Sequence, residues 1–364
     1  MRIFAEKFGS RGGRSWLGTA LPVLAAIAGG LAVSATDVGA AECEKLDEIK
    51  LQEYAGLIQN IVPWAAIEAG IFEKHCLDAT MVAIPSGPAG FAASVQGGVN
   101  FVSTAPETLM VPFSQGMDVK IVAGMNDTIH YALAVNPNLA LPHEKDGYPA
   151  VMQDLIGKRI GVNALGSTTN ALARANFVAA GLDPDDATWV AYGAPAAGFA
   201  ALQNGTVDAI QIWSDGMEIV QALVGAKIIG DLRDPELKHL PVVEGMRGAA
   251  LQWAAQTSFI EANEDVVKRF IAANSEAVAW IRDKANYDKV VDIVRRRAPS
   301  PEGIADPEAL LIQRVDKFIP QVSDKIDMSA FQAWAQFAYE NGRIPELIDA
   351  KDVIWSGSAD VIVP

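Results

Sequence analysis

Short runs of alternating apolar and polar residues occur between longer stretches in which apolar residues recur every three or four positions. The first pattern predicts β-strands and the second predicts helices. The predicted strands are 49–54, 79–84, 99–103, 119–123, 131–135, 159–163, 188–192, 208–213 and 227–229. The predicted helices between them are 63–69, 89–96, 107–115, 167–180, 197–203 and 217–224. Strands and helices that alternate in this way indicate an α/β protein with parallel sheets covered on both faces.

The pattern changes at about Asn263. From there the apolar residues follow helical spacing only, which predicts the helices 264–283, 287–297, 306–318 and 329–341. No strand is evident in this C-terminal region, so we expect its helices to bury their apolar faces on the preceding part of the chain.

One segment of the chain is nearly repeated. Residues 78–100 align without a gap on residues 186–208, and 12 of the 23 positions are identical. Each copy predicts a strand, a Gly/Pro turn, an Ala-rich helix and the start of another strand. A repeat at a distance of 108 residues is too long for a solenoid and indicates two similar α/β lobes. A cleft between two lobes is a common place for a ligand.

The N-terminus predicts export. Four basic residues precede an uncharged apolar stretch, 15–36, and small residues follow at 38–41. This order is typical of a secretory signal peptide, and we expect cleavage near Ala40. The alternative is an uncleaved membrane anchor, but Pro22 and several glycines make the stretch a poor membrane-spanning helix. No later segment is apolar for long enough to cross a bilayer.

Removal of residues 1–40 would leave 25 basic and 42 acidic residues, a net charge of about −17. An acidic chain without a basic run argues against nucleic acid as a partner. The chain has two cysteines, Cys43 and Cys76. An even number in an oxidising compartment predicts a disulfide between them, and two buried free thiols are the alternative.

No catalytic motif is evident. The four histidines are not in metal-binding spacing, no nucleophile elbow or Walker loop is present, and we expect neither a metal nor a cofactor. An enzyme on a two-lobed scaffold, using Asp127, His130 or Ser167, is the alternative that we keep.

The candidate site lies in the loops that follow the predicted strands, because ligands of open α/β sheets bind beyond the carboxyl ends of the strands. The segment 165–170 is the strongest candidate, since a helix start with several hydroxyls suits an anionic or polar group. In the first lobe the candidate ligand-binding residues are Tyr54, Asn60, Trp64, Ser86, Gly87, Thr104, Ala105 and Glu107. In the second lobe they are Gly166, Ser167, Thr168, Thr169, Tyr192, Trp213, Ser214 and Asp215.

These loops predict a particular kind of ligand. They contain no lysine or arginine but two aromatic residues from each lobe, so we expect a small organic ligand with an aromatic or heterocyclic part rather than nitrate or sulfate. Glu107 and Asp215 could meet an amine or ring N–H, while the hydroxyls of 167–169 hold a carboxylate, sulfonate or hydroxyl. Arg247 is the one nearby base that could change this expectation.

Several segments together resemble a known family. They include AIEAGIF at 66–72, QGGVNF at 96–101, GMDVKIV at 116–122, LIGKRIGV at 155–162 and NGTVDA at 204–209. Their order and spacing resemble the exported solute receptors of ABC importers for nitrate, sulfonates, taurine and thiamine-precursor pyrimidines. The pyrimidine synthases that share this fold carry a Cys-rich motif and a catalytic histidine, and no segment here matches them.

The resemblance implies a type II periplasmic binding protein with two doubly wound lobes. We expect lobe one at 41–131, lobe two at 132–250, and a return to lobe one at 251–364, with crossovers near 131–136 and 247–257. The implied function is that of a non-enzymatic, monomeric periplasmic receptor that closes on its ligand and delivers it to an ABC permease in the inner membrane. A receptor for a sensor or for another type of transporter is a further alternative.

Overall fold

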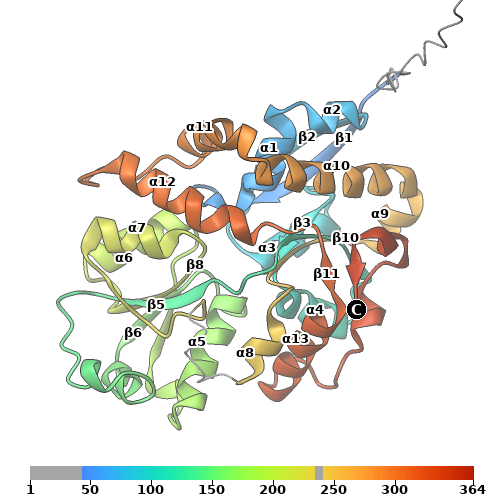
Figure 1. The fold of residues 1–364 in the computed structure, drawn as a ribbon. Helices are drawn as coiled ribbons and strands as arrows, with labels where there is room; N and C mark the ends of the chain where they lie inside the picture. The colour runs from blue at the N-terminus through green and yellow to red at the C-terminus, as the bar shows by residue number, and fades with distance from the viewer. Residues whose placement is uncertain (1–42, 234–240) are drawn as a thin grey trace, which may run out of the picture. The chain divides into compact units, whose positions relative to one another are not determined.

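The computed structural model describes residues 43–233 and 241–364 (Figure 1). The predicted signal peptide, 1–40, lies outside these residues. None of the described helices is both long and apolar enough to span a bilayer.

The first lobe contains two small sheets. β1 (Asp47–Glu53) and β2 (Leu77–Ala83) pair in parallel, with Asp47 opposite Leu77. In the second sheet, β10 (Leu251–Gln256) lies between β3 (Val102–Thr104) and β4 (Val119–Asn126) and runs antiparallel to both. The helices α1 (Ile61–Glu68), α3 (Gly87–Val95) and α4 (Pro106–Ser114) follow the strands, as the alternating pattern predicts.

The second lobe is built on one five-stranded sheet. Its order is β7 (Thr188–Ala191), β6 (Arg159–Val162), β8 (Ala209–Trp213), β5 (Tyr131–Val135) and β9 (Lys227–Ile229). β6 is parallel to β7 and β8, whereas β5 is antiparallel to β8 and β9. The accompanying helices are α5 (Thr168–Ala179), α6 (Pro195–Gln203) and α7 (Gly216–Val224).

The prediction of parallel sheets is therefore wrong for one strand in each lobe. β5 and β10 are the strands by which the chain enters one lobe from the other, and each runs against its neighbours. They include most of the residues that we expected to form the crossovers. Residues 132–135, which we also predicted as a strand, are fully buried.

The internal repeat corresponds to equivalent elements. α3 and α6 occupy the same nine positions of the two copies, 108 residues apart. β2 and β7 precede these helices, and β3 and β8 follow them. The two lobes thus use the same strand–helix–strand unit.

The predicted C-terminal helices are present as α10 (Glu264–Arg282), α11 (Tyr287–Arg297), α12 (Pro307–Phe318) and α13 (Met328–Glu340). α10 and α11 pack on α1, and α13 packs on α4, as expected. α12 also contacts α7 of the second lobe. The expectation of no strand in this region is wrong, since β11 (Ile326–Asp327) and β12 (Ile362–Val363) form a short parallel pair. The shorter helices are α2 (Ile71–Lys74), α8 (Pro241–Met246), α9 (Thr257–Ala262) and α14 (Ala350–Val353).

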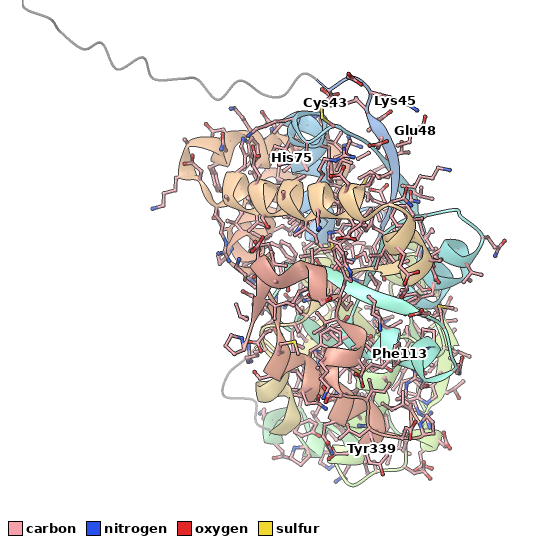
Figure 2. The ribbon with its side chains drawn as sticks, turned by 90° about the vertical axis from the view of Figure 1, so that its right-hand side faces the viewer. Cys43, Lys45, Glu48, His75, Phe113 and Tyr339 are labelled. Carbon is pink, nitrogen blue, oxygen red and sulfur yellow. A yellow bond between two sulfur atoms is a disulfide. The ribbon has the colours of Figure 1, made fainter. Side chains whose placement is uncertain are left out.

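The predicted disulfide between Cys43 and Cys76 is confirmed, with the two Cα atoms 5.5 Å apart. Cys76 directly precedes β2, and Cys43 lies just before β1, so the bond joins the starting ends of two paired strands (Figure 2). Asp47 N–H, at the start of β1, donates to the carbonyl of Cys76.

Replacing both cysteines by serine should lower the free energy of unfolding by about 3–4 kcal/mol, because the bond closes a loop across a separation of 33 residues. Urea unfolding of the oxidised protein and of the double variant measures this difference. Under reducing conditions the two proteins should unfold at the same urea concentration. Equal stability of the oxidised protein and the variant would contradict the prediction.

Candidate functional site

A small cavity of about 30 Å³ lies where the strand ends of both lobes meet. Its lining combines hydroxyl, amide and aromatic side chains and includes no charged residue. The lining residues are Tyr54, Gln59, Gly87, Ala105, Thr108, Tyr131, Asn163, Ser167, Thr168, Thr169, Trp213 and Leu251. One water molecule needs about 10–15 Å³ measured in this way, so an organic ligand requires a wider separation of these walls.

The structure brings seven of the candidate residues together in this lining. They are Tyr54, Gly87, Ala105, Ser167, Thr168, Thr169 and Trp213. The rings of Tyr54 and Trp213, from opposite lobes, are in edge-to-face contact with their centroids 6.0 Å apart. Burial raises the pKa of Tyr54 well above its usual range. Its phenol therefore stays neutral and donates to the carbonyl of Ser103 at 3.0 Å.

The other two candidate aromatics support the fold beside the cavity. Trp64 is buried, and its indole N–H donates to Glu53 Oε2 at 2.8 Å. The Tyr192 hydroxyl donates to the carbonyl of Gln211 at 3.1 Å, and its ring covers Gly198 on α6. Among the lining residues, Tyr131 is the third aromatic.

Three more candidate residues shape the first-lobe loops. Asn60 fixes the chain after β1, since its amide donates to the carbonyls of Tyr54 and Leu57 and its oxygen accepts from Tyr54 N–H. The hydroxyl of Ser86 caps α3 by accepting from Ala89 N–H. Thr104 donates to the carbonyl of the next residue.

The start of α5 carries the hydroxyl cluster that the sequence indicates. Ser167 is the N-cap residue, but its side chain does not cap the helix; it donates to the carbonyl of Ala164 at 2.7 Å. Thr169 donates to Asn163 Oδ1 at 2.7 Å and lies 2.8 Å from the Ser167 hydroxyl. The first N–H groups of α5 thus have no side-chain cap, which leaves the positive end of the helix dipole facing the cavity.

Gln59 is a lining residue that our sequence analysis missed. It belongs to the short 3-10 helix η1 (Ile58–Asn60) and is 1% exposed. Neither its amide nitrogen nor its amide oxygen has a hydrogen-bond partner among the described residues. A buried, unpaired amide is costly. Gln211 and Gln252 are in the same state, but of these three glutamines only Gln59 belongs to the cavity lining. The available signal was an amide in the apolar run LIQNIVPW.

Thr108, Tyr131, Asn163 and Leu251 were also missed as lining residues. Asn163 directly follows β6, where the rule for strand ends applies, so it could have been included. Leu251 begins β10, within the segment that we expected to form the second crossover.

Glu107 is fully buried, and its carboxylate accepts hydrogen bonds from Arg343, Thr168 and Thr108. Arg343, which follows α13, donates from Nε to Glu107 Oε1 at 2.7 Å and from Nη2 to the carbonyl of Gly166 at 2.6 Å. Thr168 donates to Glu107 Oε2 at 3.0 Å, and its hydroxyl lies 2.6 Å from that of Thr108. These contacts join α4 of the first lobe directly to the start of α5.

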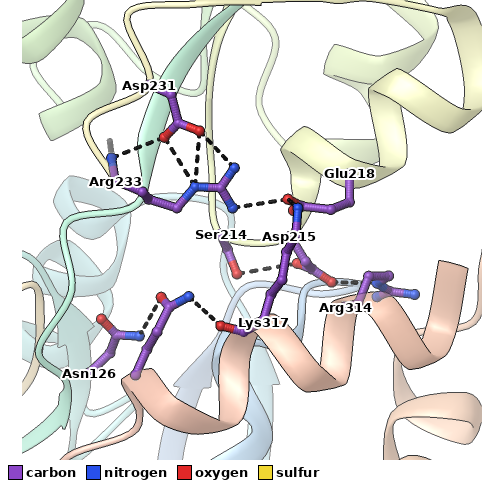
Figure 3. A network of polar contacts seen from close by, with 9 residues as sticks. Asn126, Ser214, Asp215, Glu218, Asp231, Arg233, Arg314 and Lys317 are labelled. Atoms are coloured by element: carbon purple, nitrogen blue, oxygen red, sulfur yellow. Dashed lines mark hydrogen bonds and ion pairs between the residues drawn. The ribbon is translucent and has the colours of Figure 1, made fainter. Parts of the chain in front are cut away.

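Asp215 is also buried and already paired (Figure 3). Its Oδ2 accepts from Arg314 Nε at 2.6 Å, and its Oδ1 accepts from the N–H of Ile58 and from the hydroxyl of Ser214, both at 3.2 Å. Nearby, Glu218 binds Lys317 and Arg233. Both candidate carboxylates therefore bind arginines of the C-terminal region.

Arg247, the base that we considered, donates to the carbonyl of Leu232 at 3.1 Å and does not belong to the cavity lining.

Asp127, His130 and Ser167, the residues considered for an enzyme, do not form a proton-transfer pair with one another. Burial, together with the positive charge of nearby Arg233, lowers the pKa of His130 to about 4. Asp127 accepts from the hydroxyl of Thr128, while Ser167 bonds Ala164 and Thr169. No three His, Cys, Asp or Glu side chains converge as metal ligands in the ranges that the structure describes.

The chain belongs to the NMT1/THI5-like family, whose family model matches residues 59–286. The match begins within η1, at Gln59, includes β2 to β10 and the first C-terminal helix, and ends before Arg314 and Arg343.

Individual relatives are more distant. A Bacillus subtilis (strain 168) protein named "Putative aliphatic sulfonates-binding protein" is 26% identical over 92% of this chain and 93% of its own length. The alkanesulfonate-binding protein SsuA from Xanthomonas axonopodis pv. citri, solved with MOPS, has a TM-score of 0.65 at 18% identity, over 85% of this chain and 99% of that chain. A DszB mutant in complex with biphenyl-2-sulfinic acid has a TM-score of 0.53 at 16% identity, over 86% and 98%. Similarity to solved periplasmic binding proteins shows that this chain has their fold.

Replacing Arg343 by methionine should lower the free energy of unfolding by about 1.5–3 kcal/mol, because a buried carboxylate loses a charged hydrogen-bond donor. The bond to the second lobe is lost as well, so the radius of gyration from small-angle scattering should increase. Lys351→Met is the control, since Lys351 is exposed and pairs only with Asp349 among the contacts seen. An unchanged radius and unchanged stability for Arg343→Met would refute this role.

His130 should make the protein less stable in mild acid. An unfolded imidazole takes up a proton below its ordinary pKa of 6.5, whereas the folded one does so only at about 4, so stability falls as the pH drops through this window. Between pH 7 and pH 5, wild type should lose about 2 kcal/mol more than His130→Phe in urea unfolding. Parallel losses in the two proteins would show that His130 titrates normally.

Proposed function

We propose that this protein is a periplasmic solute-binding receptor that closes on a small organic ligand and delivers it to an ABC permease. The family and the fold support a receptor of this class. The observation that carries the proposal is the neutral cavity between the lobes, where an uncapped helix start and the unpaired amide of Gln59 meet aromatic side chains.

We propose a ligand with one anionic or strongly hydrogen-bonding end and an apolar, preferably aromatic, body. The anionic end suits the N-terminus of α5 and its hydroxyls, which favour a sulfonate or carboxylate. Tyr54, Tyr131 and Trp213 offer aromatic surfaces for the body. Because Glu107 and Asp215 are occupied by arginines, the ligand needs no cationic group. The names of the relatives, which mention sulfonates, agree with this choice.

We also propose that the protein is not an enzyme and that it acts as a monomer. The cleft presents hydroxyls that are bonded to one another or to main-chain carbonyls, and no base contacts Ser167 among the described residues. Binding by lobe closure needs only a shift between open and closed populations. The structure has many direct contacts across the cleft, as in a closed form.

Calorimetry with benzenesulfonate, MOPS, taurine, benzoate, cytosine, nitrate and sulfate tests the proposal. We expect the tightest binding for an organic sulfonate or carboxylate that has a ring. Gln59→Ala should weaken that binding about tenfold, because it removes two contacts in a buried site. Gln336→Ala is the matched control, since Gln336 lies on α13 and bonds the exposed Glu340. Micromolar binding of nitrate without any response to the organic compounds would refute the proposed ligand class.

A further inference from the structure

Asp215 follows a residue with an unusual backbone conformation. Ser214 has a φ of +57°, in the left-handed region that non-glycine residues rarely adopt. Asp215 itself directly precedes the first residue of α7. Ser214 N–H donates to the carbonyl of His130, at the point where the chain enters the second lobe. A strained residue of this kind persists where the surroundings fix it, often next to a functional group.

The carboxylate of Asp215 links three parts of the chain. Its two oxygens join the second lobe to Ile58 in the first lobe and to Arg314 on α12. Arg314 has a fully buried side chain and also donates from Nη1 to the carbonyl of Ala298 at 2.9 Å. Buried ion pairs add little net stability compared with apolar residues of similar size, so stability alone does not explain this pair.

The bond to Ile58 matters because Ile58 directly precedes Gln59. The 3-10 helix η1 consists of only three residues, Ile58–Asn60. Asn60 anchors it within the first lobe, whereas Asp215 anchors it from the second lobe. The η1 segment carries the unpaired amide of Gln59. Asp215, which holds one side of this segment, reaches it only when the two lobes are together.

We propose that Asp215 and Arg314 are positioning residues that hold Gln59 in its ligand-facing place in the closed arrangement. This inference rests on the proposed function, because it assigns Gln59 to ligand recognition. Arg314 orients the carboxylate of Asp215, and Asp215 transmits the position of the second lobe to η1. The pair thus couples lobe closure to the completion of the site without touching the ligand.

Hydrogen–deuterium exchange tests the coupling directly when it is measured both without ligand and with saturating MOPS, which favours the closed arrangement. In Asp215→Ala/Arg314→Met, which removes both charges together, the N–H of Ile58 should exchange at least about tenfold faster, because its acceptor is gone. Asp215→Asn/Arg314→Met retains an acceptor oxygen and should restore most of the protection. Lys317→Met is the control on the same helix, since Lys317 bonds Glu218 and not Asp215. Unchanged exchange at Ile58 in the Asp215→Ala/Arg314→Met protein would overturn the inference.

A double-mutant cycle tests whether the pair acts through Gln59. With MOPS as the probe, Asp215→Ala/Arg314→Met should weaken binding about tenfold in wild type but less than twofold in Gln59→Ala, because coupled residues are not additive. Equal losses in both backgrounds would show a general structural effect and refute the role. If none of the organic sulfonates or carboxylates binds wild type, the proposed ligand class fails, whereas exchange at Ile58 without ligand still tests the positioning of η1.

Discussion

The close approach of the two lobes depends on two buried carboxylates, whose charges are neutralised by arginines of the C-terminal region. Glu107 and Asp215 lie at the cleft with almost no exposure, and Arg343 and Arg314 supply their counter-charges. A buried carboxylate without such a partner is unfavourable, so the lobes can approach this closely only with these arginines in place. The C-terminal helices therefore contribute to the cleft as well as to the core of the first lobe.

The pairing of both carboxylates with arginines also determines which kind of ligand suits the cavity. Since both acids are already paired, the surfaces that face the cavity are neutral hydroxyls, amides and aromatic rings, together with the start of α5. A neutral site with oriented N–H groups binds an anionic end through dipoles, and aromatic surfaces contribute area and shape. In the proposed receptor, selectivity among anions would then depend on the body of the ligand and on contacts such as those of Gln59.

Much of the fold was predictable because it follows from local periodicity. The repeat at 78–100 and 186–208 identified equivalent units, and α3 and α6 occupy the same positions in them. The direction of β5 and β10 was not predictable, since an apolar run has the same pattern in a parallel and an antiparallel strand. The rule for strand ends found seven residues of the cavity lining. It could not find Arg314 or Arg343, which reach the cleft from more than 90 residues away in sequence.

Gln59 shows why loops after strands are not a sufficient guide to a site of this kind. Its importance comes from burial without a partner, and the unpaired state depends on how η1 is held between Asn60 and Asp215. An amide in an apolar run can equally be a satisfied core residue, as Asn274 is, with Trp253 and Gly124 as its partners. Only the three-dimensional contacts distinguish the two cases. Because the contact that holds η1 comes from the opposite lobe, the proposed recognition by Gln59 and the proposed closure of the cleft would be parts of one equilibrium.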